Sequence, residues 1–195
     1  MDVMIQGEKE EKKIVRLHTG DPCLYGAIRE QMDRLEEEGI SYEVCPGVSS
    51  FCGAAASLQA EYTLPGISQT VIITRMEGRT PVPEREKLRS LAAHQSTMVL
   101  FLSTGLLVQV REELLAGGLA PDTPCAICYK ATWEDEKIVR GVLDELPELA
   151  ERAGIRKTAL IVVGKVLESE YELSRLYAAE FTTEFRQGRK DEDQK

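Results

Sequence analysis

The sequence has no apolar run that approaches the ~20 residues needed to cross a bilayer. Its start, MDVMIQGEKEEKK, lacks the apolar core of a signal peptide. Basic residues are outnumbered, 24 against 33 acidic ones, and the resulting charge of −9 disfavours a broad phosphate-binding surface. We therefore expect a cytoplasmic protein that binds neither a membrane nor nucleic acid.

Cysteine and histidine are too few and too scattered for a disulfide framework or a zinc site. The chain has five cysteines and two histidines. Cys125 and Cys128 form a lone CxxC with no second pair and no histidine nearby, whereas zinc needs four ligands, or three and a water. Their setting in PCAICY is typical of a buried strand. We predict core packing for both thiols and no metal held by the protein.

The sequence also contains no GxGxxG fingerprint, no phosphate loop and no internal repeat. Hydrophobic residues make up 43% and charged residues 29%, as in globular proteins. Strand-like runs alternate with helical ones, which predicts an α/β fold with a mainly parallel sheet. The predicted strands are 13–18, 41–45, 70–74, 97–102, 124–129, 136–143 and 159–167, and the helices lie around 28–35, 48–60, 88–92, 107–114 and 144–154.

Leu64, Pro65 and Gly66 interrupt this alternation and indicate a domain junction. We expect a small α/β domain over 1–66 and a second α/β domain over 67–186. The charged residues 187–195 form a tail that we expect to be disordered.

Two turns follow predicted strands and precede predicted helices, where α/β sheets bind ligands. The first is HTGDPCLYG (18–26), with a glycine and a carboxylate, and the second is PGVSS (46–50), with two hydroxyls beside a helix start. Ordinary helix capping explains either turn as well as ligand binding does. No base lies beside the serines in sequence, so we identify no catalytic residue.

A third polar segment is the loop TRMEGRTPVPE (74–84), which carries two arginines after a strand. An arginine fork matches a carboxylate in bidentate fashion, so the loop suits a substrate rich in carboxylates. A plain solvated loop is the alternative.

Taken together, HTGDPCLYGA, PGVSSFCGAAASLQAEYTLPG and ITRMEGRTPVPE resemble the tetrapyrrole methylase superfamily, and within it the branch that methylates a corrin precursor of cobalamin. The resemblance runs from about Asp2 to Arg186. It implies two α/β domains of the class III methyltransferase type, S-adenosylmethionine as methyl donor, a tetrapyrrole substrate and a homodimer. The family's opening strand and glycine-rich loop have no counterpart before Ile14, so the resemblance implies a truncated first domain.

The resemblance also assigns binding residues by matching motifs. The cofactor contacts that it implies are Thr19, Gly20, Asp21, Leu24, Ser49, Ser50, Leu102, Ala131 and Ala159. In the arginine loop, Arg75 and Arg79 would anchor acetate or propionate groups of the substrate, and Met76 would pack near the methyl donor.

Two other functions stay open at this point. One is a ribosomal RNA methyltransferase on the same fold, which should show a basic face that this acidic chain lacks. The other is a non-catalytic chain that binds the cofactor without turnover.

Overall fold

The computed structural model describes residues 1–168, 181–182 and 184–187. The chain forms two compact units, Met1–Gly53 and Ala54–Lys195. The expected domains 1–66 and 67–186 remain a prediction. Most of the expected tail, residues 188–195, lies outside the described residues.

The first unit contains helices α1 (Asp2–Lys9) and α2 (Arg29–Glu37), and α3 (Ser50–Leu58) begins in it. Its α2 follows the predicted helix, with Leu35 buried and Gly39 at a φ of 68° just after the helix. Helix α1 was not expected from the sequence.

The predicted strands 13–18 and 41–45 are wrong, because neither segment is a strand in the structure. A strand needs a neighbour to which its N–H and C=O groups can bind, and both segments lack one among the described residues. Their apolar side chains are therefore left in solvent: Val15 is 70% and Leu17 is 80% exposed. Local β propensity alone did not make a sheet here.

The second unit is built on a five-stranded sheet in the order β1-β2-β5-β3-β4. Its strands are β1 (Val71–Arg75), β2 (Thr97–Phe101), β3 (Pro124–Tyr129), β4 (Lys137–Val142) and β5 (Ala159–Val163). Each falls within one residue of the predicted start. The end of the last predicted strand forms a 3-10 turn, Lys165–Leu167, because Gly164 at a φ of 147° breaks the extended backbone.

The expectation of a mainly parallel sheet is wrong. Only β1 and β2 pair in parallel, whereas β5 runs antiparallel to both β2 and β3, and β3 runs antiparallel to β4. The short connection 130–136 between β3 and β4 is too short for the helical crossover that a parallel pair requires.

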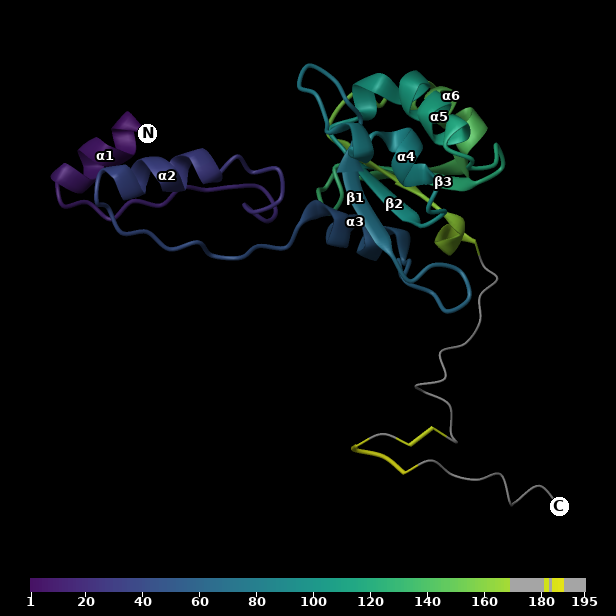
Figure 1. Cartoon of the computed structure of the whole chain (residues 1–195), viewed down its shortest axis with the longest axis horizontal. Coiled ribbons are helices and arrows are strands. Elements are labelled where there is room, and N and C mark those ends of the chain that lie inside the picture. The colour runs from purple at the N-terminus through teal and green to yellow at the C-terminus, as the bar shows by residue number, and fades with distance from the viewer. Residues whose placement is uncertain (169–180, 183, 188–195) are drawn as a thin grey trace. The chain divides into compact units, whose positions relative to one another are not determined.

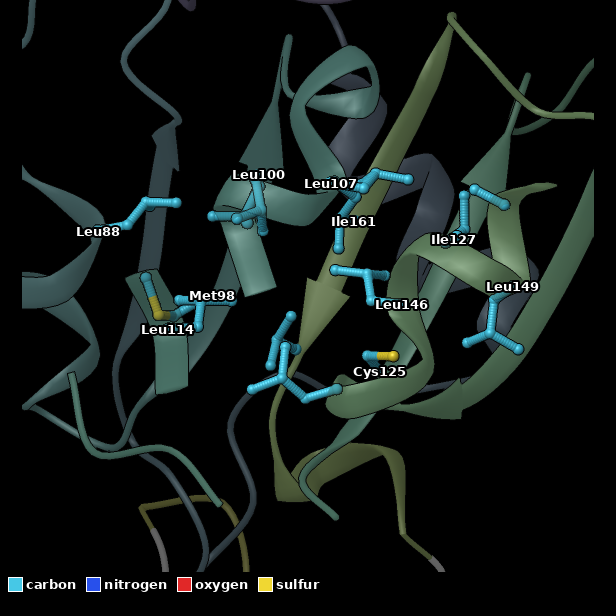
Figure 2. Close-up of a cluster of buried hydrophobic side chains, with 14 of the residues drawn as sticks. Leu88, Met98, Leu100, Leu107, Leu114, Cys125, Ile127, Leu146, Leu149 and Ile161 are labelled. Atoms are coloured by element: carbon cyan, nitrogen blue, oxygen red, sulfur yellow. The ribbon is translucent and has the colours of Figure 1, made fainter. Parts of the chain in front are cut away.

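Helices α4 (Leu88–Ala92), α5 (Leu107–Ala116) and α6 (Leu146–Ala153) gather on one side of this sheet (Figure 1). Alternate residues of the strands meet the apolar faces of these helices in one buried cluster (Figure 2). Met98, Leu100, Ile127 and Ile161 of the strands are fully buried there, as is Leu114 of α5. This cluster holds the three helices against the sheet.

Candidate functional site

In the first unit, Asp21 joins the two turns that the sequence singles out. Its Oδ2 accepts a hydrogen bond from the Gly47 amide at 2.9 Å, and its Oδ1 accepts one from the Cys23 amide at 2.7 Å. The backbones also touch, since a Cβ on Gly47 would lie 2.3 Å from the carbonyl oxygen of Gly20. Segments 26 residues apart in sequence thus form one structure, which needs glycine at position 47.

The two amide donors, that of Gly47 above all, hold the pKa of Asp21 below its usual range. The carboxylate is therefore ionised at neutral pH. Partial desolvation and the charge of Asp21 raise the pKa of the neighbouring Cys23 thiol. Cys23 is accordingly a thiol rather than a thiolate nucleophile at neutral pH.

The other cofactor residues expected in the first unit lie in these joined turns. Leu24 is half-buried, and its amide donates to the Asp21 carbonyl at 3.3 Å. Ser49 is buried, and its carbonyl accepts from the Cys52 and Gly53 amides as α3 begins. Thr19, Gly20 and Ser50 are exposed. The Ser49 carbonyl caps the start of α3. The hydroxyl groups of Ser49 and Ser50 make no hydrogen bond to the described residues. The same turn can therefore cap the helix and bind a ligand.

The second unit has its own candidate site at one edge of the sheet. Strands β1, β2 and β3 end at this edge, and β5 begins there, as the pairs Arg75–Phe101, Leu100–Ile161 and Tyr129–Ala159 establish. The three cofactor residues that the resemblance implies for this unit, Leu102, Ala131 and Ala159, therefore lie at a common edge.

Backbone geometry makes this edge suitable for a ligand. Leu102 has a φ of 53° and is 72% exposed, which turns the chain sharply as β2 ends. Thr104 fixes the start of β5, since its hydroxyl donates to the Ala159 carbonyl at 3.0 Å. Across the described chain, the backbone groups of Leu102 and Ala131 have no hydrogen-bond partner. Such free N–H and C=O groups fit the adenine and methionine parts of S-adenosylmethionine.

The connection 130–136 is held by contacts that the sequence did not reveal. The Glu136 carboxylate accepts from the Ser57 hydroxyl at 2.6 Å and from the Thr132 amide at 2.5 Å, and these bonds lower the pKa of Glu136. The Lys130 ammonium lies 5.3 Å from the centroids of the Tyr129 and Trp133 rings. These contacts order the backbone around Ala131.

The three residues expected to bind the substrate differ in their surroundings. The Arg75 guanidinium donates to carbonyl oxygens of its own loop, at 2.9 Å for Pro81. Met76 is half-buried and packs against the hydrophobic cluster. Arg79 is exposed, with no hydrogen bond or ion pair to the described residues. Ser103, which sequence reasoning missed, accepts a hydrogen bond from the Met76 amide at 2.8 Å.

Cys125 and Cys128 are 1% exposed in β3, which confirms the prediction of core packing. Burial raises the pKa of each thiol to about 12. None of the described residues forms a cluster of three possible metal ligands. Within the same part of the chain, no helix is long and apolar enough to span a membrane.

Residues 2–147 match the family model of the tetrapyrrole (corrin/porphyrin) methylases, and the chain belongs to this family. A cobalt-precorrin-4 C(11)-methyltransferase of Methanocaldococcus jannaschii is 54% identical over 97% of this chain and 74% of its own length. The fold agrees with that of a solved cobalt precorrin-4 methyltransferase of cobalamin biosynthesis, at a TM-score of 0.84 and 50% identity, over 86% of this chain and 70% of the other.

A second solved structure is the uroporphyrin-III C-methyltransferase of Thermus thermophilus in complex with S-adenosyl homocysteine. It is similar at a TM-score of 0.72 and 26% identity, over 85% of this chain and 72% of its own. The chain spans about three quarters of the length of the M. jannaschii relative.

Proposed function

We propose that this chain transfers a methyl group from S-adenosylmethionine to carbon 11 of precorrin-4, with or without cobalt, in the biosynthesis of cobalamin. The observation that carries the proposal is the 54% identity to the M. jannaschii enzyme over 97% of the chain. The family match over residues 2–147 spans all three segments on which the resemblance rests. The identity to the M. jannaschii enzyme favours this substrate over RNA, as does the charge of −9.

S-adenosylmethionine, when bound, supplies an electrophilic methyl group, which a nucleophilic carbon of the macrocycle accepts as S-adenosyl homocysteine leaves. The chain's contribution is alignment, and orienting two reactants can supply ~7 to 11 kcal/mol of a barrier. We assign this role to the joined turns of the first unit and to the sheet edge of the second. No side chain is assigned as a base.

In the first unit, Asp21 orients the backbone of both turns, and Thr19, Gly20, Leu24, Ser49 and Ser50 offer contacts to the cofactor. In the second unit, Leu102, Ala131 and Ala159 offer backbone contacts. Arg79 supports binding of the acetate or propionate groups of the macrocycle, because its fork is exposed and unpaired among the described residues. Met76 belongs to the same loop and packs against the hydrophobic cluster.

Calorimetric titration with S-adenosylmethionine, followed by incubation with precorrin-4, tests the proposal. We expect saturable cofactor binding and formation of S-adenosyl homocysteine that depends on precorrin-4. Cofactor binding without any turnover would favour the non-catalytic alternative. Turnover with ribosomal RNA but not with the tetrapyrrole would overturn the proposed substrate.

The proposed location is the cytoplasm, where the other steps of such a pathway would share their intermediates. The proposed assembly is a homodimer. Its support within this chain is the set of exposed apolar side chains in the two unpaired segments of the first unit, Val15, Leu17, Tyr42 and Val44.

A further inference from the structure

The loop 76–81, which follows β1, is closed on itself by the side chain of Arg75. The guanidinium Nη1 donates to the carbonyls of Met76 at 3.3 Å and Thr80 at 3.1 Å, and Nη2 donates to that of Pro81 at 2.9 Å. One planar fork thus binds both ends of the loop. Only arginine presents several donors in such a fixed geometry.

A second contact fixes the same loop to the neighbouring strand. The Met76 amide donates to the Ser103 hydroxyl oxygen at 2.8 Å, and that hydroxyl donates to the Phe101 carbonyl at 2.6 Å. Ser103 is 0% exposed. Its hydroxyl therefore acts as a buried link between the start of the loop and the end of β2.

Between these two anchors lies Arg79, the other cation of the loop. It is exposed, and among the described residues its guanidinium has neither a hydrogen bond nor an ion pair. The sequence alone does not distinguish the two arginines of this loop, but in the structure their donors differ in what they bind. The donors of Arg75 bind backbone carbonyls, whereas those of Arg79 bind none of the described residues and can reach a ligand.

We propose that Arg75 and Ser103 are positioning residues, which hold loop 76–81 in the shape that presents Arg79 to a carboxylate of the substrate. Arg75 then contributes to substrate affinity only through Arg79. The identity of the ligand as a polycarboxylate tetrapyrrole rests on the proposed function, whereas the order of the loop does not.

Hydrogen exchange followed by mass spectrometry tests the positioning role independently of activity. We expect Arg75→Gln and Ser103→Ala each to raise the exchange rate of the peptide that covers residues 76–81 by about tenfold, because each loses a fixed contact. The matched control is Arg85→Gln, an exposed arginine in the 3-10 turn Glu84–Glu86, which should leave that rate unchanged. Wild-type exchange in both test variants would overturn the positioning role.

A double-mutant cycle then asks whether Arg75 acts through Arg79. The probe is uroporphyrin III, a stable polycarboxylate tetrapyrrole, and the readout is its dissociation constant in the presence of S-adenosyl homocysteine. We expect Arg79→Gln and Arg75→Gln each to weaken binding by about tenfold, and Arg75→Gln to add little when Arg79 is already replaced. Additive losses would overturn the proposal, because Arg75 would then contact the ligand itself.

Affinity for S-adenosyl homocysteine and the melting temperature should stay at wild-type values in Arg75→Gln. A fall in both the affinity and the melting temperature would mean that Arg75 stabilises the whole unit. That result would overturn its role in positioning loop 76–81. If the loop variants exchange faster while the wild-type protein binds no tetrapyrrole, the positioning role stands. The proposed substrate and the role of Arg79 then fall.

Discussion

At the scale of single residues, Asp21 carries the clearest expectation. Both of its oxygens accept backbone hydrogen bonds, so Asp21→Asn leaves only one acceptor for the two amides. We expect the turns to separate and the affinity for S-adenosylmethionine to fall by roughly tenfold. Calorimetric titration measures this loss, with Asp33→Asn as the control, since that carboxylate is half-buried on α2 and pairs with Arg29 of the same helix. Unchanged affinity would remove Asp21 from the cofactor site.

The same carboxylate predicts a pH dependence. Because the pKa of Asp21 is lowered in the folded chain, its stabilising contribution is present above the pKa of the unfolded chain and is lost as the pH falls through the folded value. The difference in unfolding free energy between the wild type and Asp21→Asn should therefore be largest near neutral pH. It should shrink in acid, below the ordinary carboxyl pKa of about 3.9. Urea unfolding over this range measures it, and a constant difference would contradict the assignment.

At the scale of the elements, Gly117 sets how closely α4 and α5 approach. A Cβ at this position would lie 2.5 Å from the Ala92 Cβ and 2.5 Å from the Arg89 carbonyl oxygen. Gly117→Ala should lower the free energy of unfolding by about 1 to 3 kcal/mol, because a backbone atom cannot move aside cheaply. Gly105→Ala, which has open space, is the control. Equal stability of the two variants in urea would show that the helices can separate without cost.

The sequence predicted strands well where the burial of their own side chains determines them. It predicted them poorly where a strand depends on a neighbouring strand for its hydrogen bonds. The β2 run TMVLF becomes a strand because four of its five residues are buried, with Met98 and Leu100 in the hydrophobic cluster. The run KIVRLH has the same β propensity but no partner strand among the described residues, so it stays irregular. Local sequence patterns also could not predict the direction of the strands. The position of β5 between β2 and β3 depends on tertiary packing.

The candidate site follows the same division. Only the structure reveals that position 47 needs glycine, whereas motif resemblance indicated Asp21. It gave Arg75 and Arg79 one common role, because hydrogen bonds to the backbone of a loop leave no pattern in the sequence. Ser103 was missed for the same reason: a serine after a strand is common, and only the structure reveals that it is buried against the Met76 amide.

At the scale of the whole molecule, the exposed apolar side chains of 13–18 and 41–45 predict self-association. Unpaired backbone beside exposed apolar residues favours pairing with another chain. We expect a homodimer or larger oligomer at micromolar concentration by light scattering. Leu17→Lys should shift it toward the monomer, whereas Val3→Lys, 86% exposed on α1, should not. A compact, thermally stable wild-type monomer would contradict this prediction.

We propose above all that carbon 11 of the substrate receives the methyl group. The position of the new methyl group in the product tests this most directly. Precorrin-4 incubated with the protein and S-adenosylmethionine labelled with ¹³C in the methyl group should yield a tetrapyrrole with one labelled methyl on carbon 11, observed by carbon NMR. The label on another carbon, or no labelled tetrapyrrole despite cofactor binding, would contradict the claim.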